Sequence, residues 1–138
     1  MNKRNIIITL SDYTRLSQMV SLWSLSQRER DAARALKGEL ERAEIVALDE
    51  VPPDVITMNS RAELLDLDTH ELMEVTVVYP EQANLDEGKI SVLAPVGTGM
   101  LGYRVGNTFE QRAPFGVRRL KVLAVTFQPE AAFEATTA

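Results

Sequence analysis

Two adjacent prolines, Pro52 and Pro53, divide the chain into two parts whose hydrophobic residues follow different periods. Proline lacks the backbone N–H that a helix interior needs, so no helix can continue through this point. Apolar residues recur at helical spacing before the prolines and alternate as in strands after them. The sequence therefore predicts an α+β protein, with a strand and a helical hairpin over residues 1–50 and a sheet domain over residues 51–138.

The N-terminal part is predicted to form a short strand and two helices. The apolar residues 6–8 are the strand, and Ser11 is a suitable N-cap for the first helix, with Asp12 in its first turn. Apolar residues then recur in steps of three and four, first at Tyr13, Leu16, Val20 and Trp23 and, after a polar break, at Ala33, Leu36, Leu40, Ala43 and Ala47. So narrow a seam is typical of a coiled coil.

The two helices are predicted to be antiparallel, because the break at residues 24–27 is too short for any other connection. The narrow seam and the charged outer faces favour a hairpin that projects about 18 Å at 1.5 Å per residue. The alternative is two helices that pack on the rest of the domain. In either case the base of the hairpin must pack on the globular part, since two short helices alone are marginally stable in water.

The part after the prolines is predicted to form an antiparallel sheet with one short helix. Its strands are expected at residues 55–58, 62–67, 72–79, 89–93, 108–112 and 117–127. The last two strands form a hairpin that turns through Pro114, Phe115 and Gly116. The alanine-rich tail after Pro129 is expected to fray.

Residues 89–107 combine a strand pattern with a proline and with glycines at positions 97, 99, 102 and 106. Pro95 ends the strand, and the glycines permit positive φ or close backbone approach. The segment predicts a tight turn into one short helix, with Met100 and Leu101 in the core. It also contains a Gly-x-Gly-x-x-Gly match, but no βαβ unit surrounds it, so no nucleotide site is expected.

This segment resembles the C-terminal domain of the bacterial transcript-cleavage factors of the Gre family. Their pattern is Ile-Ser-x-x-Ser-Pro-x-Gly-x-Ala-Leu-Leu-Gly followed by Gly-Asp. This chain reads Ile-Ser-Val-Leu-Ala-Pro-Val-Gly-Thr-Gly-Met-Leu-Gly from Ile90, and it departs from the pattern at Ala94, Gly99, Met100 and Asn107. Residues 53–61, 78–80, 94–97 and 128–132 are similar to a branch of that family with a shortened coiled coil. The resemblance implies an FKBP-like fold for the sheet domain.

The resemblance also implies a partner and a contact surface. In the Gre family the loop with the Ser-Pro-x-Gly pattern contacts the rim of the RNA polymerase secondary channel. Carried over to this chain, the polymerase-binding residues are Ala94, Pro95, Val96 and Gly97. The protein is then expected to be a transcription regulator that binds bacterial RNA polymerase and competes with Gre factors.

The predicted tip of the hairpin differs from that of the Gre factors, which carry two carboxylates there that help to hold a catalytic Mg²⁺. Here the tip holds Arg28, Glu29, Arg30 and Asp31, and the Gre tip pattern is absent. Neighbouring arginines are expected to pair with both carboxylates, and a cationic tip repels Mg²⁺. We therefore expect binding without stimulated transcript cleavage, and no catalytic residue, metal or cofactor in this chain.

Composition and charge narrow the function classes. The chain has no cysteine, which excludes a disulfide or a thiolate metal site, and no apolar run of the ~20 residues that span a membrane. Its net charge is −5, and residues 51–100 carry two basic against nine acidic side chains. This balance does not suit independent sequence-specific nucleic-acid binding and favours a basic protein partner. We expect a cytoplasmic monomer.

Several polar residues have two interpretations. Four basic residues flank the final hairpin, namely Arg112, Arg118, Arg119 and Lys121. They contact an acidic polymerase surface or RNA, or they are the exposed side of an edge strand that protects it from aggregation. The single histidine, His70, lies in a polar bend and is expected to be solvated.

Two other functions are considered. An FKBP-like scaffold can carry a ligand-binding or prolyl isomerase site, but such a pocket is lined by aromatics, and this chain has one Trp, three Tyr and four Phe. Control of nucleoside diphosphate kinase, associated with the branch that has the short coiled coil, is expected to be an indirect result of altered transcription. The chain offers no kinase motif.

Overall fold

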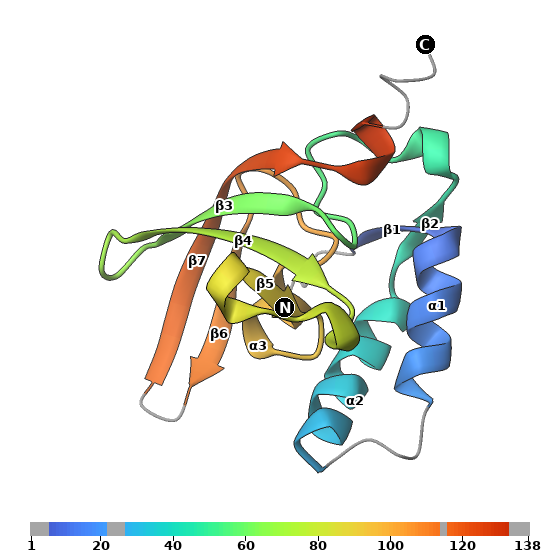
Figure 1. Ribbon diagram of the computed structural model, residues 1–138, viewed down its shortest axis with the longest axis horizontal. Coiled ribbons are helices and arrows are strands. Elements are labelled where there is room, and N and C mark those ends of the chain that lie inside the picture. Colours follow the sequence, from blue (N-terminus) through green and yellow to red (C-terminus); the bar gives the residue numbers. More distant parts are fainter. Residues whose placement is uncertain (1–5, 22–26, 114–115, 133–138) are drawn as a thin grey trace.

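The computed structural model describes residues 6–21, 27–113 and 116–132. Its first four elements are β1 (Ile7–Thr9), α1 (Leu10–Val20), α2 (Gln27–Glu41) and β2 (Glu44–Val46). The two helices form an antiparallel hairpin, and β1 and β2 pair in parallel at its base (Figure 1). The predicted strand and helical hairpin are therefore confirmed for the described residues, and Trp23 lies outside them.

The first helix begins earlier than predicted. Thr9, not Ser11, is the N-cap of α1, and its hydroxyl oxygen accepts a hydrogen bond from the Asp12 N–H at 3.2 Å. The next residue, Leu10, already belongs to the helix. Asp12 lies in the first turn as expected, where a carboxylate is favoured by the helix dipole.

The second helix ends at Glu41, so the prediction that it continues to Ala47 is wrong. The Glu44 N–H instead donates to the Ile6 carbonyl oxygen at 2.8 Å, and Ile45 pairs with Ile8. The β-branched residues Ile45 and Val46 thus join a strand, because a partner strand is present that the helical period does not reveal. Ala43 and Ala47 lie outside the helix.

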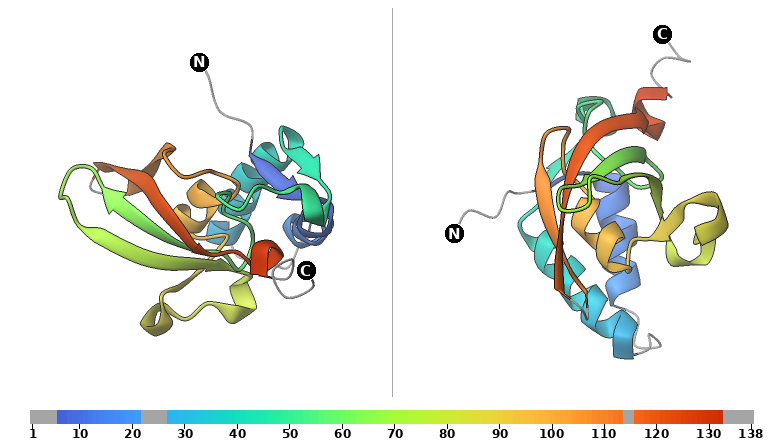
Figure 2. Two further views of the ribbon diagram at one scale, coloured as in Figure 1. Left: turned by 90° about the horizontal axis from the view of Figure 1, so that it is seen from above. Right: turned by 90° about the vertical axis from the view of Figure 1, so that its left-hand side faces the viewer.

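The helical hairpin lies against the sheet domain and does not stand free of it, which corrects the expected projection. The apolar residues of its inner faces, Leu16, Ala33, Leu36 and Leu40, belong to one continuous core with residues of the sheet and of the short helix α3 (Pro95–Met100). In Figures 1 and 2 the two helices lie beside the sheet and α3. The second arrangement considered from the sequence therefore fits the described residues.

The second part of the chain forms a five-stranded sheet in the order β5-β4-β3-β7-β6. Its strands are β3 (Arg61–Asp66), β4 (Leu72–Val78), β5 (Lys89–Ser91), β6 (Thr108–Ala113) and β7 (Gly116–Phe127). Three neighbouring pairs are antiparallel, but β5 runs parallel to β4. The connection through η2 (Pro80–Gln82) and η3 (Leu85–Glu87) projects from the sheet and returns the chain for this parallel pairing (Figure 2).

Residues 55–58 do not form the strand that was predicted. Val55 makes only an isolated bridge to Arg104, and the chain then turns. The Ser60 hydroxyl oxygen accepts a hydrogen bond from the Thr57 N–H at 2.9 Å, and Asn59 adopts a φ of 67°. Side-chain capping of the turn takes the backbone donor that a neighbouring strand would otherwise use.

The segment after Pro129 is held in place as far as Ala132, which corrects the expectation that it frays. Residues 129–132 form one helical turn, and Glu130 is 7% exposed. The Gln128 side-chain N–H₂ donates to the carbonyl oxygens of Pro52 and Val55, at 2.8 Å each. Two segments far apart in the sequence, residues 52–60 and 128–132, are thus joined.

The glycine-rich segment forms the predicted tight turn into a short helix, α3 (Pro95–Met100). A Cβ atom at Gly97 would collide with the Ser91 carbonyl oxygen, and one at Gly99 would come within 2.7 Å of the Phe109 ring. Met100 and Leu101 are buried as predicted, at 0% and 1% exposed. Close packing of α3 on β5 and β6 therefore explains both glycines.

We predict that Gly97→Ala lowers the free energy of unfolding by about 1–3 kcal/mol, because the atom that the new methyl group meets is backbone and cannot rotate away. Gly38→Ala is the matched control, since nothing lies within 4 Å of a Cβ atom at that helical position. It is expected to stabilise by about 0.5–1 kcal/mol. Urea unfolding measures both, and equal stability of Gly97→Ala and the native chain would contradict the packing described.

We also predict that Leu36→Ala lowers the free energy of unfolding of the whole protein by about 2–5 kcal/mol, since Leu36 is fully buried in the shared core. The control is Leu85→Ala, because Leu85 is 81% exposed, and its effect should stay within about 0.5 kcal/mol. Unfolding is followed by circular dichroism and by hydrogen exchange of the sheet amides. A variant that loses helix while the sheet keeps its stability would show that the hairpin is independent.

Candidate functional site

The candidate contact residues 94–97 form the N-cap and the first turn of α3, just after the chain leaves β5. Ala94 is the N-cap of α3 in an extended conformation, and Pro95 is at the start of the helix, where its missing N–H costs nothing. The Ala94 N–H donates to the Ser91 carbonyl oxygen at 2.9 Å, and the Thr98 hydroxyl donates to the Val92 carbonyl oxygen at 2.6 Å. These bonds fix the turn without any ligand.

The candidate contact residues differ in exposure. Ala94 is half-buried, whereas Val96 is 9% exposed and packs in the core, and Gly97 is buried against Ser91. Val96 and Gly97 therefore offer a partner little surface. The turn is a rigid structural unit, and its role as a contact stays a prediction.

The candidate tip residues, Arg28, Glu29, Arg30 and Asp31, lie in the first turns of α2, which begins at Gln27. Asp31 is exposed, and its Oδ1 atom accepts a hydrogen bond from the Gln27 side chain at 3.4 Å and lies 4.0 Å from the Arg34 guanidinium. Asp31 is thus engaged on the surface of its own helix. Among the described residues, no group of three or more histidines or acids is arranged to hold a metal ion.

Two of the basic residues of the final hairpin form ion pairs within the protein. Arg118 pairs with Asp66 at 3.1 Å, and Arg119 pairs with Asp68 at 2.8 Å. The N–H groups of Asp68 and Thr69 hold the pKa of Asp66 below its usual value, with Arg118 adding to the effect. The Arg119 hydrogen bond likewise lowers the pKa of Asp68. These pairs fasten β7 to the turn after β3.

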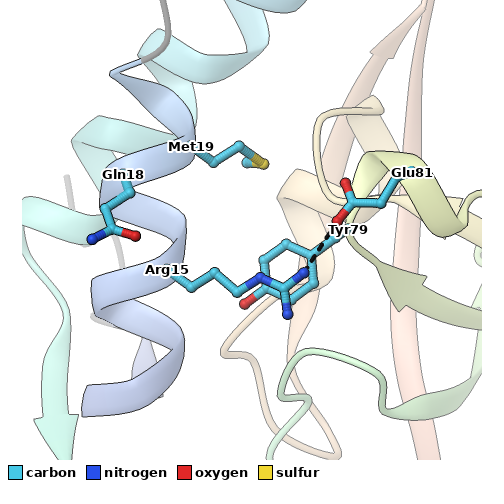
Figure 3. A pocket seen from close by; sticks show the side chains of 5 residues that line it. All are labelled: Arg15, Gln18, Met19, Tyr79 and Glu81. Carbon is cyan, nitrogen blue, oxygen red and sulfur yellow. Dashed lines mark hydrogen bonds and ion pairs between the residues drawn. The ribbon is translucent and has the colours of Figure 1, made fainter.

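A shallow hollow of about 260 Å³ lies between α1 and η2, lined by Arg15, Gln18, Met19, Tyr79 and Glu81 (Figure 3). The Arg15 guanidinium lies 3.7 Å from the centre of the Tyr79 ring and 3.1 Å from Glu81 Oε1. The single aromatic ring of this hollow is thus covered by Arg15. It does not offer the aromatic lining that a prolyl isomerase site requires.

Sequence reasoning missed a buried polar cluster beneath this hollow. The Thr57 hydroxyl donates to Glu130 Oε1 at 2.6 Å, and Asp12 on α1 lies close enough to Glu130 for the two charges to repel. Burial and this repulsion raise the pKa of Asp12 to about 6. Burial, with the nearby Asp12 charge, also raises the pKa of Tyr79. The available signal was the similarity of segments 53–61 and 128–132 to one family branch, which did not reveal that they meet.

Comparison with known proteins agrees with the fold. The family model "Transcription elongation factor, GreA/GreB, C-term" matches residues 51–127, and the model "Rnk N-terminus" matches residues 4–46. Regulator of nucleoside diphosphate kinase from Escherichia coli (strain K12) is 44% identical over 101 residues, which cover 72% of this chain and 74% of that protein.

A second sequence relative and a solved structure are also named as transcription elongation factors of the Gre type. Transcription elongation factor GreA from Magnetococcus marinus is 35% identical over 92 residues, which cover 67% of this chain and 59% of that protein. A solved structure titled "Prokaryotic transcription elongation factor GreA/GreB from Nitrosomonas europaea" superimposes with a TM-score of 0.74 and 36% identity, covering 91% of this chain and all of that one. On these matches, the chain belongs to the GreA/GreB family of transcription elongation factors and has an N-terminal part of the Rnk type.

Proposed function

We propose that this protein regulates transcription by binding RNA polymerase near the secondary channel, where it competes with Gre factors without stimulating transcript cleavage. The turn at residues 94–97 is the observation that supports this most. It combines the family's sequence pattern with a conformation fixed by internal hydrogen bonds and by the close approach of Gly97 to Ser91. A contact surface that needs no rearrangement loses little entropy on binding.

The acidic balance of the sheet domain supports a protein partner with a basic surface. Residues 51–100 carry nine acidic and two basic side chains, whereas Arg118 and Arg119 are engaged by Asp66 and Asp68. Free nucleic acid is repelled by such a surface, while a basic protein surface is attracted. We propose that the protein acts as a cytoplasmic monomer. Among the described residues, no helix has the length and hydrophobicity needed to cross a membrane.

The absence of cleavage stimulation is proposed from the hairpin. The 15 residues of α2, which carry the candidate tip carboxylates, extend about 22 Å, and part of that length lies against the sheet domain. Ligands of Mg²⁺ must approach the ion to about 2.1 Å, so a carboxylate that stops short contributes nothing. In addition, Asp31 Oδ1 already accepts a hydrogen bond from the Gln27 side chain.

The name of the relatives refers to nucleoside diphosphate kinase, and in this proposal the effect on that kinase is indirect. The glycine-rich segment is packed against backbone at Gly97 and against the Phe109 ring at Gly99, so it is not open to a phosphate. We propose that any effect on that kinase follows from altered transcription.

We predict that Pro95→Ala weakens binding to purified bacterial RNA polymerase by about tenfold or more, which corresponds to ~1.4 kcal/mol at a contact. Pro53→Ala is the matched control, because Pro53 is an exposed proline in the connector before the sheet. Binding is measured by pull-down and by displacement with a Gre factor. A folded native protein that shows no association at micromolar concentration would falsify polymerase binding. Equal binding of Pro95→Ala and Pro53→Ala would show that Pro95 is not a contact residue, and it would leave polymerase binding itself unaffected.

We predict that the protein leaves the rate of transcript cleavage in backtracked elongation complexes unchanged, because the described part of its hairpin is short and Asp31 there is engaged by Gln27. Cleaved RNA is measured on denaturing gels at saturating factor, with a GreA protein as the positive control. In mixtures the protein should slow GreA-stimulated cleavage by competition. Efficient cleavage by this protein alone would contradict the arguments from reach and from the engaged Asp31.

A further inference from the structure

All four candidate contact residues lie inside a loop that is closed by one side-chain hydrogen bond. The Thr98 hydroxyl donates to the Val92 carbonyl oxygen at 2.6 Å, across residues 94–97. The Thr98 N–H donates to the Ala94 carbonyl oxygen at 2.8 Å, which is the first regular hydrogen bond of α3. Thr98 therefore binds the chain at two points, with its side chain before the contact residues and with its backbone at the first of them.

The N-cap residue of α3 contributes no hydrogen bond of its own side chain. It is Ala94, whose methyl group cannot accept a hydrogen bond from the N–H groups of the first turn. A helix of six residues is too short to be stable alone, and Gly97 and Gly99 lower its helix propensity further. The local sequence is thus insufficient to fix the start of this helix, and bonds to neighbouring residues must do so.

The Val92 carbonyl oxygen depends on the same bond. Val92 is fully buried, and among the described residues no other hydrogen bond reaches its carbonyl oxygen. A buried acceptor without a donor is unfavourable, so loss of the Thr98 hydroxyl would favour conformations in which this carbonyl meets water. Because residues 92 and 98 flank the contact residues, such conformations would present residues 94–97 differently.

We propose that Thr98 is a positioning residue for docking: its hydroxyl holds residues 94–97 in the conformation that binds RNA polymerase, in place of the capping side chain that Ala94 lacks. This inference rests on the proposed function. It assigns Thr98 no contact with the polymerase. Its effect is on the fraction of molecules in which the turn is ready to bind.

A positioning role and a contact role differ in the kinetics of binding. When only a fraction of the molecules has the competent turn, the apparent affinity falls by that fraction, because fewer encounters are productive. A lost contact instead speeds dissociation. Thr98→Val removes the hydroxyl and keeps the branched shape. We expect it to lower the association rate constant for immobilised, purified polymerase about tenfold and to leave the dissociation rate constant within about twofold of native.

Two further variants assign the effect to the hydroxyl and to its place. Thr98→Ser keeps the hydroxyl and should restore association to within about twofold of native. Thr14→Val is the matched control, because the Thr14 hydroxyl also donates to a backbone carbonyl oxygen, that of Leu10 at 2.9 Å, but on the exposed surface of α1. It should associate like the native chain. If Thr98→Val does not fold, Thr98→Ala removes the hydroxyl without placing a methyl group beside the Val92 carbonyl.

Hydrogen exchange measured by NMR tests the turn in the free protein. The amide of residue 98 should be protected in the native chain, because its N–H is bonded to Ala94. Thr98→Val should lower this protection about tenfold or more, while central amides of β3 and β7 keep theirs. Thr14→Val should leave the protection at residue 98 unchanged.

The outcomes separate this inference from the function on which it rests. A folded native chain that does not associate with the polymerase would overturn the proposed function and the docking role of Thr98 with it. Native-like association by Thr98→Val, faster dissociation with unchanged association, or undiminished protection at residue 98 would overturn the positioning role while polymerase binding stands. Association by Thr98→Ser as slow as that of Thr98→Val would overturn it as well.

Discussion

The contact between Ile6 and Gly102 fixes the N-terminal part of the chain to the sheet domain. Gly102 has a φ of 82°, and a Cβ atom there would collide with the Ile6 side chain, so only glycine allows the two backbones to approach this closely. The Ile7 N–H donates to the Gly102 carbonyl oxygen at 3.3 Å, and the Glu44 N–H donates to that of Ile6. Because α1 follows β1 and α2 precedes β2, this one contact sets the base of both helices. The glycine of the family pattern therefore serves the attachment of the hairpin as well as the turn that precedes it.

Carboxylates play two opposite roles in this protein. Asp66 and Asp68 accept hydrogen bonds from backbone N–H groups or from arginines, and their pKa values are lowered, so their stabilisation is present above the ordinary pKa and is lost only as strong acid protonates them. Asp12 faces another carboxylate in a buried place, and its pKa is raised to about 6. The difference arises because hydrogen-bond donors surround the first two acids, whereas burial of Asp12, with repulsion from Glu130 adding to it, disfavours its charged form.

Sequence patterns predicted the elements whose signals are local. Pro95 and the glycines after it indicated the turn into α3, and the alternating residues of β3 and β4 indicated two paired strands. The errors arose where a distant partner decides the structure. Residues 44–46 leave the helical pattern because β1 offers a parallel strand, and residues 55–58 lose their strand because Ser60 and Gln128 take their backbone groups. The buried hydrogen bond between Thr57 and Glu130 could not be predicted, since no periodicity relates the turn at residues 57–60 to the segment after Pro129.

The same attachments bear on how a polymerase-bound protein would present its hairpin. If the turn at residues 94–97 docks as proposed, the docked segment is anchored directly in the core, because Val96 and Met100 of α3 are core residues. Leu36 and Leu40 of α2 lie in this same core, so the docking turn and the hairpin move together as long as the core is intact. Leu16 of α1 is fully buried in the same core, so both helices of the hairpin are held in a fixed relation to the docking turn.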